Sequence, residues 1–399
     1  MEDKEAKATG QLLQCIEVTT AETQAVKAWL KQQALLHDEY KVKKMNGNLV
    51  VLPLCNNCTL SQCQMLDLNK LCLSYRTVLI PMRSLQARKY KLDKISQPLH
   101  QSVADLYEKS TGIPLAANLA AQIPNHWIKH DDMIVLPANS FTAQEWLALG
   151  DELWHLVCST LGAKRLAKNS AILNDNHRTP NVEMLLGDCS WVTHMDNGIK
   201  YTFDITKCMF SPGNITEKIR ISNFDCSEEI IVDLYAGIGY FVLPYLIHAK
   251  AKFVHACEWN PHAVEALEKS LILNKVREKC TVYFGDNRQH APKFIADRVN
   301  LGLLPTSRPG WHIACAALRP DRGGWLHVHG NVNTYKVVQS ERKQFWQQWG
   351  EEVASELELI LNQMHSDKSG WKATCKSVTH VKRYAPHIDH LIADVHCTV

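Results

Sequence analysis

Acidic residues at the ends of short apolar runs are the residues of this chain best suited to ligand binding. Asp233 ends a β-branched run, and Gly237 follows it after a short gap. Glu258 ends the next apolar run, at the distance from the glycine where an acid accepts hydrogen bonds from a ribose. A third run leads into Asp286 and Asn287, which offer an acceptor and an amide to an adenine edge. These residues predict a site for a cofactor that contains adenosine.

The segments around these residues alternate between strand and helix patterns. Residues 229–234 have the length and β-branched content of a buried parallel strand, and the Gly237–Gly239 turn leads into a helical pattern. Residues 252–257 and 281–284 predict the next two strands, with a helix over 261–273 between them. Ligands of open α/β sheets bind outside the carboxyl ends of the strands, so the acids would share one crevice. The alternative is that each acid only caps a helix or turn, which explains one such residue better than three at successive strand ends.

The glycine turn favours S-adenosylmethionine over a dinucleotide. A dinucleotide site needs a third glycine or alanine where Val242 stands, because the helix must pack closely and hold a pyrophosphate at its N-terminus. S-adenosylmethionine has no pyrophosphate, and it requires only a close backbone approach at Gly237 and Gly239. We therefore expect S-adenosylmethionine to be the cofactor.

The C-terminal half completes an α/β sheet. Runs at 298–305 and 324–330 predict the fourth and fifth strands, and an amphipathic helix covers 340–364. The strand-like runs 371–380 and 390–396 have no helix between them, so they should pair antiparallel. The predicted fold class is α/β, with a Rossmann-like class I methyltransferase sheet that is mostly parallel and has an antiparallel C-terminal strand.

Several motifs in this half are similar to those of one known family. They span residues 209–220, 233–241, 257–263, 285–288 and 384–390. Together they resemble the tRNA guanosine-37 N1-methyltransferase superfamily, and within it the wybutosine-synthesis branch, which transfers an aminocarboxypropyl group to tRNA-Phe. The resemblance runs from about Asp131 to the C-terminus and is strong from Phe203 onward.

The resemblance implies cofactor ligands where this chain matches the family's motifs. In the family, the serine and the basic residue of the Phe-Ser-Pro segment, the acid that ends the second strand, and the Asp-Asn pair contact S-adenosylmethionine. A serine and a lysine suit the methionine carboxylate, and a glutamate suits two ribose hydroxyls. The matching residues, followed by two from the glycine turn, are Ser211, Lys218, Glu258, Asp286, Asn287, Asp233 and Gly237.

Two departures from the methyltransferase branch bear on the reaction. That branch has arginine where Gly213 stands here, and an Asn-Leu-Pro sequence where this chain has Gly302–Pro305. An asparagine there would hold the edge of the target base, so its absence disfavours N1 methylation of guanosine. S-adenosylmethionine has three electrophilic carbons, and the one that faces the acceptor is transferred. Turning the amino acid arm toward the acceptor would transfer a 3-amino-3-carboxypropyl group and leave methylthioadenosine.

The acceptor follows from the resemblance alone. It implies carbon 7 of 4-demethylwyosine, the tricyclic base at position 37 of tRNA-Phe, in wybutosine biosynthesis. Two alternatives stay open: a tRNA guanosine-37 N1-methyltransferase, which would leave S-adenosylhomocysteine, and an inactive tRNA-binding scaffold. The intact residues Glu258, Asp286 and Lys218 disfavour the scaffold.

The sequence assigns no firm catalytic base. Glu217 and Asp204 flank the matched segment and are the candidates, although both also fit solvated acids or strand-end caps. Positioning and the electrophilic sulfonium could supply most of the rate.

The cysteines do not predict a metal site. The chain has 14 cysteines at irregular spacing, which fits reduced thiols inside the cell. A zinc site with four thiolates needs two tight pairs, and only one is present in the N-terminal cluster. That cluster consists of Cys55, Cys58, Cys63 and Cys72.

The chain divides into three predicted domains that together would hold a tRNA. Residues 1–110 form an N-terminal tRNA-contacting module, 111–205 a small α+β substrate-side domain, and 206–399 the catalytic domain. The net charge of +3 is mild, so local basic clusters matter more than the total. These clusters are Lys41–Lys44, Arg88–Lys91, and Lys164–Lys168 together with Arg178.

Composition predicts a cytoplasmic protein with no membrane partner. The chain has 399 residues, of which 46% are hydrophobic, yet no apolar run is long enough to cross a bilayer. No secretory signal pattern stands at the start. We expect a monomer that binds the anticodon region of tRNA-Phe, on which other enzymes of the wybutosine pathway also act.

Overall fold

The computed structural model describes most of the chain in two compact units. The units are Met1–Leu92 and Asp93–Val399. The described residues are 12–33, 35–37, 40–45, 48–55, 60–72, 75–81, 85, 96–170, 180–365 and 370–399. The predicted boundaries at residues 110 and 205 stay predictions.

The first unit is an antiparallel sheet with two helices packed against it. Its strands are β1 (Leu12–Thr19), β2 (Lys43–Lys44), β3 (Leu49–Pro53) and β4 (Arg76–Pro81), in the order β2-β3-β1-β4. Its helices are α1 (Thr23–Gln32) and α2 (Gln62–Leu71). Ile16, Val26, Leu52 and Leu68 from all these layers are buried in one core. Leu13, Cys15 and Val51, which alternate with these residues along β1 and β3, are buried in a second, smaller cluster.

The second unit begins with a small α+β layer. Its strands are β5 (Ile128–His130), β6 (Met133–Leu136), β7 (Arg165–Asn169) and β8 (Val182–Leu186), in that order. Its helical elements are α3 (Gln97–Thr111), α4 (Ala117–Ala120), the 3-10 helix η2 (Gln144–Leu149) and α5 (Gly150–Thr160). Leu99 and Val103 of α3 are buried against Leu153 and Val157 of α5. Helix α3 therefore belongs to the core of this layer.

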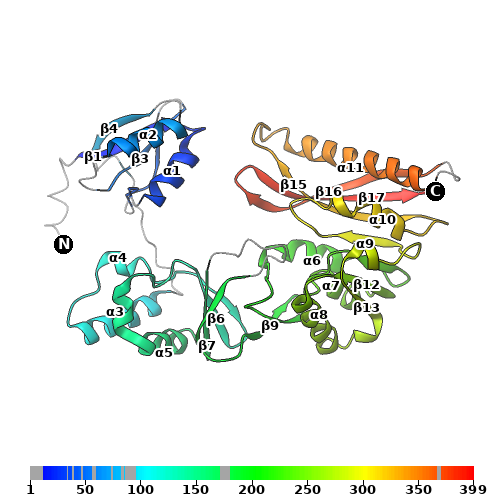
Figure 1. The fold of residues 1–399 in the computed structure, drawn as a ribbon, viewed down its shortest axis with the longest axis horizontal. Helices are drawn as coiled ribbons and strands as arrows, with labels where there is room; N and C mark the ends of the chain where they lie inside the picture. Colours follow the sequence, from blue (N-terminus) through cyan, green and yellow to red (C-terminus); the bar gives the residue numbers. More distant parts are fainter. Residues whose placement is uncertain are drawn as a thin grey trace. The chain divides into compact units, whose positions relative to one another are not determined.

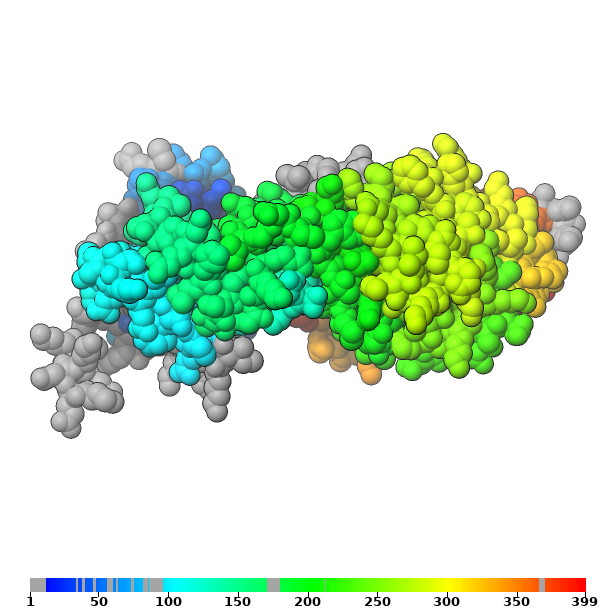
Figure 2. Space-filling view, turned by 90° about the horizontal axis from the view of Figure 1, so that it is seen from below, coloured from blue at the N-terminus to red at the C-terminus, as the bar shows by residue number. Residues whose placement is uncertain are grey.

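A hairpin joins the small layer to the large sheet. It consists of β9 (Trp191–Asp196) and β10 (Ile199–Asp204), which pair antiparallel. Tyr201 and Phe203 are buried in the same apolar cluster as Met133 and Ile231. In Figure 2 the green surface of this region lies between the cyan helices and the yellow-green part of the large sheet. The shared cluster makes the hairpin a wall between the two layers.

The large sheet carries the predicted cofactor site. Its strands are β11 (Ile230–Asp233), β12 (Phe253–Glu258), β13 (Cys280–Phe284), β14 (Arg298–Leu301), β15 (Gly324–Asn333), β16 (Lys372–Ala385) and β17 (Ile388–Thr398). Their order is β13-β12-β11-β14-β15-β17-β16. The strands from β11 to β15 pair in parallel, whereas β17 is antiparallel to both β15 and β16. The predicted class I methyltransferase fold, with its antiparallel C-terminal strand, is confirmed.

Helices cover both faces of the large sheet (Figure 1). They are α6 (Ile215–Ser222), α7 (Val242–Ile247), α8 (Pro261–Leu273), α9 (Asn287–His290), α10 (Trp311–Ala317) and α11 (Arg342–Met364). Side chains of α7 and α8 are buried with those of β12 and the β9–β10 hairpin. Side chains of α10 and α11 are buried on the opposite face with those of β14 and β15. Asn260 caps α8 by accepting a hydrogen bond from His262 N at 3.0 Å, and Pro261 follows it, as the sequence predicts.

Candidate cofactor-binding site

A cavity of about 530 Å³ opens at the carboxyl ends of the parallel strands. It lies where the strand order reverses between β11 and β14, the usual ligand position in open α/β sheets. Its size falls within the range of small-molecule sites. Five of the seven predicted cofactor residues line it. They are Ser211, Gly237, Glu258, Asp286 and Asn287.

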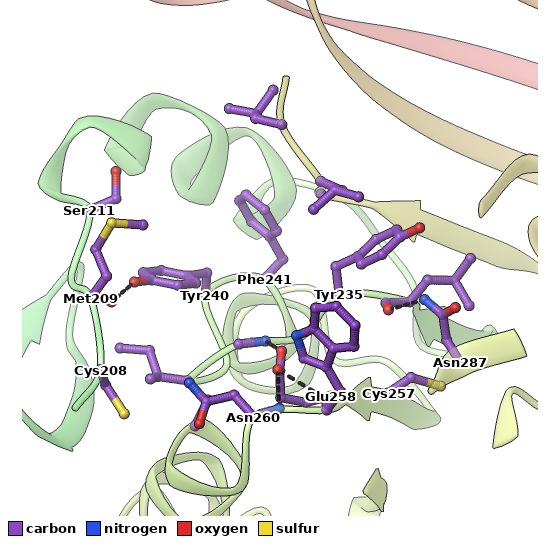
Figure 3. A pocket seen from close by; sticks show the side chains of 18 of the residues that line it. Cys208, Met209, Ser211, Tyr235, Tyr240, Phe241, Cys257, Glu258, Asn260 and Asn287 are labelled. Atoms are coloured by element: carbon purple, nitrogen blue, oxygen red, sulfur yellow. Dashed lines mark hydrogen bonds between the residues drawn. The ribbon is translucent and has the colours of Figure 1, made fainter. Parts of the chain in front are cut away.

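Figure 3 shows how these residues are spread along the cavity. Asn287 lies on one side, Glu258 lies near the middle, and Ser211 lies with Met209 on the other side. Tyr240 lies beside Met209, and its hydroxyl donates a hydrogen bond to Met209 O. The cavity therefore has the length to take a nucleoside at one end and an attached chain at the other.

Glu258 is fixed by the backbone that surrounds it. Its Oε2 accepts a hydrogen bond from Gly237 N at 2.7 Å. Its Oε1 accepts hydrogen bonds from Trp259 N at 2.9 Å and Asn260 N at 2.8 Å. Gly237 has φ +55°, which a side chain would strain, and this turn aims its N–H at the carboxylate. These contacts fix the orientation of the carboxylate at the end of β12, and a carboxylate oxygen is the type of acceptor that ribose hydroxyls require.

The Asp286–Asn287 pair begins α9 at the far side of the cavity. Asp286 caps this helix by accepting a hydrogen bond from Arg288 N at 2.9 Å. Its carboxylate is also paired with the Arg288 guanidinium, and that hydrogen bond lowers the pKa of Asp286. Asn287 Nδ2 donates to Leu234 O at 2.8 Å, which fixes the amide plane against the end of β11. These groups form a polar edge suited to an adenine ring.

Asp233 does not line the cavity but lies under its first loop. Its side chain is completely buried, and its Oδ1 accepts a hydrogen bond from Tyr235 N at 3.1 Å. Its Oδ2 has no hydrogen-bond partner within the described chain. Burial raises the pKa of Asp233 to about 7 and outweighs the lowering effect of the Tyr235 N–H and of the Asn300 amide, which lies near the carboxylate without forming a well-aligned hydrogen bond; the charge of Glu258 adds to the rise. Asp233 therefore shapes the loop that carries the glycine turn.

Lys218 also lies outside the cavity lining. It is 1% exposed, and its Nζ donates to Asp196 Oδ2 of the hairpin at 2.8 Å. The ammonium lies 4.3 Å from the ring centre of Tyr201 and 5.6 Å from that of Tyr240, and burial lowers its pKa. Lys218 is a buried cation behind the wall that Tyr240 presents to the cavity, and its contact with a cofactor stays a prediction.

The two candidates for a catalytic base are engaged elsewhere. Glu217 is 1% exposed and accepts hydrogen bonds from Arg220 Nε at 2.7 Å and Nη2 at 2.8 Å. Asp204 is buried and caps the turn after β10 through Thr206 N at 2.9 Å. Neither residue lines the cavity. Their positions give no support to direct contact with a substrate.

Sequence reasoning missed several residues of the lining. Trp259 and Tyr384 line the cavity and are each 50% exposed, so both present an aromatic face near its mouth. Arg288 and Lys382 also line it. Tyr384 belongs to a motif that the resemblance singled out, whereas no sequence signal indicated that Lys382 of β16 reaches a site built on β11 and β12.

The cysteine cluster falls partly outside the described residues. Cys55 Sγ donates to Leu36 O at 3.4 Å, and Cys72 Sγ donates to Leu68 O at 3.1 Å. Cys58 and the side chain of Cys63 lie outside the description. Within the described ranges, no group of three or more His, Cys, Asp or Glu side chains is placed to hold a metal ion.

The predicted basic clusters are described only in part. Arg88–Lys91 and Arg178 lie outside the described residues. Lys164 is exposed at the start of β7, whereas Arg165 is paired with Asp132 and donates from Nη1 to Trp191 O at 2.7 Å. Arg165 therefore supports the contact between the small layer and the hairpin. In the part of the chain that is described, no helix is both long and apolar enough to span a membrane.

Comparisons with known proteins agree with this geometry. Residues 192–357 match the TRM5/TYW2 methyltransferase domain, and residues 113–190 match the TYW2 N-terminal domain. A tRNA wybutosine-synthesizing protein 2 homolog from Rattus norvegicus is 40% identical, with 94% of each chain covered. One from Danio rerio is also 40% identical, with 96% of this chain and 98% of the relative covered.

A solved structure extends the comparison to three dimensions. The crystal structure of P. horikoshii TYW2 in complex with MeSAdo has a TM-score of 0.57 and 25% sequence identity. It covers 74% of this chain and 99% of the archaeal chain. Sequence identity of 40% over nearly the whole length of these two relatives, together with the matching fold, shows that this chain belongs to the tRNA wybutosine-synthesizing protein 2 family.

Proposed function

We propose that this protein is an S-adenosylmethionine-dependent tRNA aminocarboxypropyltransferase. It moves the 3-amino-3-carboxypropyl group to carbon 7 of 4-demethylwyosine at position 37 of tRNA-Phe, in wybutosine biosynthesis. The observation that carries the proposal is 40% identity, over 94% of both chains, to a tRNA wybutosine-synthesizing protein 2 homolog. Archaeal TYW2 proteins that share the fold have been crystallised with AdoMet and with MeSAdo.

Three groups of cavity residues would each bind one part of S-adenosylmethionine. Glu258, fixed by three backbone N–H groups, would accept hydrogen bonds from the ribose hydroxyls. Asp286 and Asn287 would meet the adenine edge. Ser211, at the other side of the cavity, would contact the amino acid arm. Each of these side chains can form hydrogen bonds with the part of S-adenosylmethionine to which it is assigned.

The transfer needs alignment more than a strong catalyst. The bond between the sulfonium sulfur and the aminocarboxypropyl chain breaks, and its electron pair stays on sulfur to give neutral methylthioadenosine. A bond forms from that chain to carbon 7 of the base, which then loses its proton to solvent or to a nearby acceptor. Holding the two reactants in alignment removes a large share of the activation barrier of such a reaction. A cavity whose walls are fixed by backbone contacts provides this alignment.

The tRNA substrate is the partner that this function requires. We infer binding of the anticodon region, since the modified base lies there, and a target base flipped toward the exposed rings of Trp259 and Tyr384. Exposed basic residues such as Lys164 would contact phosphates. We further propose that the protein acts as a cytoplasmic monomer on the tRNA that other wybutosine enzymes also modify.

The experiment is product analysis with two labelled donors. Purified protein is incubated with tRNA-Phe that carries the tricyclic precursor, and with S-adenosylmethionine labelled either in the methyl group or in the carboxyl group. The proposal expects carboxyl label on the tRNA and methylthioadenosine in solution. Unmodified tRNA-Phe, which has guanosine at position 37, is tested in parallel as the second acceptor. Methyl label on that tRNA, with S-adenosylhomocysteine in solution, would establish the methyltransferase alternative. Absence of both products with either acceptor, while tRNA still binds, would establish the scaffold.

A further inference from the structure

Lys382 brings an unpaired positive charge to the cavity from a distant strand. It lies on β16 and lines the cavity together with residues of the loop after β11 and of the end of β12. The described part of the lining contains one other cation, Arg288, whose charge is paired with Asp286. Although its backbone pairs with β17, the Lys382 side chain makes no ion pair or hydrogen bond with any described residue. It is therefore the cation of this wall that can accept a new anionic partner.

A bulge in β16 turns this part of the strand toward the site. The pairing of β16 with β17 shifts register between His380 and Lys382, and again between Arg383 and Ala385. Bulges of this kind re-aim side chains and are frequent beside active sites. Tyr384, the residue that the second shift leaves without a partner residue on β17, also lines the cavity. The irregular pairing thus delivers two side chains of an edge strand into one cavity.

Gly213 provides the space that the Lys382 side chain occupies. A Cβ placed on Gly213 would overlap the Lys382 ammonium and would lie 3.1 Å from its Cδ and 3.3 Å from its Cε. Gly213 lies two residues after Ser211, in the 3-10 turn η3 (Pro212–Asn214). The end of Lys382 therefore rests on the backbone at the Ser211 side of the cavity.

The residues proposed to bind the nucleoside lie away from Ser211. Asn287 and Glu258 lie at one side and in the middle, so a chain attached to the ribose would extend toward Ser211 (Figure 3). That chain carries a carboxylate in S-adenosylmethionine. Lys218 cannot turn to meet it without leaving Asp196, with which it is buried. Among the described residues that line the cavity, Lys382 is the remaining cation on that side.

We propose that Lys382 binds the carboxylate of the amino acid arm of S-adenosylmethionine, and that glycine is required at position 213 to admit it. The proposal rests on the function proposed above and adds a positioning residue to it. An ammonium at this end fixes the direction of the arm and thereby the carbon that faces the acceptor base. Burial without a partner lowers the pKa of Lys382, and an arriving carboxylate would remove that penalty.

The test compares two ligands that differ by the arm. Methylthioadenosine has the adenosine and sulfur of S-adenosylmethionine but no carboxylate. Lys382→Met keeps the apolar stem and removes the charge. We expect titration calorimetry to show S-adenosylmethionine binding weakened on the order of ten- to a hundredfold, with methylthioadenosine binding unchanged. Lys376→Met, on the same strand and outside the cavity lining, is the matched control and should alter neither.

Gly213→Ala supplies an independent arm of the test. Its Cβ should displace the lysine and produce the same selective loss, and adding it to Lys382→Met should weaken binding no further. Equal weakening of both ligands would overturn the proposal, since Lys382 would then support the cavity as a whole. Unchanged binding of both ligands, with weaker tRNA binding and a shallower salt dependence, would overturn it in favour of a phosphate contact.

The binding test separates this proposal from the proposed function. Neither titration requires group transfer. If product analysis gave S-adenosylhomocysteine, selective loss in Lys382→Met would still assign the carboxylate contact. If product analysis gave methylthioadenosine but Lys382→Met bound both ligands as the unaltered protein does, the function would stand and Lys382 would have no part in holding the arm.

Discussion

Asp233→Asn should make the protein more stable at neutral pH than the unaltered protein. Asp233 is completely buried, and one of its carboxylate oxygens has no hydrogen-bond partner in the described structure. Burial raises its pKa to about 7 from the ordinary value of 3.8. Asparagine has nearly the same shape, carries no charge, and can keep the acceptor that Tyr235 N uses.

The size of the effect follows from the two pKa values. A difference of about 3 pKa units, at 1.36 kcal/mol each, corresponds to about 4 kcal/mol. Because the folded pKa is raised, the folded state binds the proton more tightly than the unfolded chain does. Stability due to this group is full below pH 3.8, falls as pH rises, and levels off above about pH 7. Asparagine does not titrate, so its advantage should grow by about 1.4 kcal/mol per pH unit between pH 5 and 6.5.

The assay is urea unfolding of both proteins at pH 5, 6, 7 and 8 without ligand. The quantity of interest is the free energy of unfolding of Asp233→Asn minus that of the unaltered protein. Asp188→Asn removes an exposed carboxylate and serves as the control. A difference that stays constant over this pH range would refute the reasoning, because it would mean that Asp233 does not titrate there on folding.

Three further changes test other parts of the structure. Glu258→Gln replaces a carboxylate that accepts hydrogen bonds from three backbone N–H groups. The affinity for S-adenosylmethionine should fall on the order of tenfold or more, while the affinity for tRNA stays the same. Equal loss of affinity for both ligands in binding assays would contradict the ribose assignment. Asp394→Asn should destabilise the fold by about 3 kcal/mol at neutral pH, because it removes one of the two buried carboxylates that pair with Arg220 and the carboxylate that accepts a hydrogen bond from His327. Burial raises the pKa of Asp394, but His327 and Arg220 outweigh this effect and hold the pKa well below 3.8. The loss of stability in Asp394→Asn should therefore shrink in urea unfolding as pH falls below about 4. Lys164→Glu should weaken tRNA binding and flatten its dependence on salt in filter binding, without lowering the melting temperature.

The sheet and its ligand edge were predictable because local pattern and global topology agree. The β-branched run before Asp233 and the apolar run before Glu258 could satisfy their backbones and bury both faces only as central parallel strands. Once the strands are parallel, their carboxyl ends meet at one edge, and the acids that follow them must lie near each other. This is why Glu258, Asp286 and Asn287 line one cavity, while their contacts with a cofactor remain to be tested.

Spacing alone could not predict whether a charged residue of a helix faces the solvent or the core. Lys218 and Glu217 both lie on α6, and both charged side chains turn inward. Lys218 does so because Asp196 of the hairpin receives its charge. Glu217 does so because it pairs with Arg220 of the same helix, which is itself held by Asp394 of β17. A charged residue is normally assigned to the solvent face, and only the complete fold supplies the buried counterion that reverses this assignment.

The end of the cavity near Ser211 depends on a contact that no local pattern encodes. Lys382 reaches Gly213 because β17 inserts between β15 and β16, which places β16 at the sheet edge, and because two register shifts alter the direction of its side chains. A side-chain period of two would assign Lys382 and Tyr384 to the same face as His380, but it cannot place that face over a loop attached to β10. The residues proposed to bind the adenosine follow successive parallel strands and could be read from local patterns, whereas the residue proposed to hold its attached arm depends on the strand order of the whole sheet.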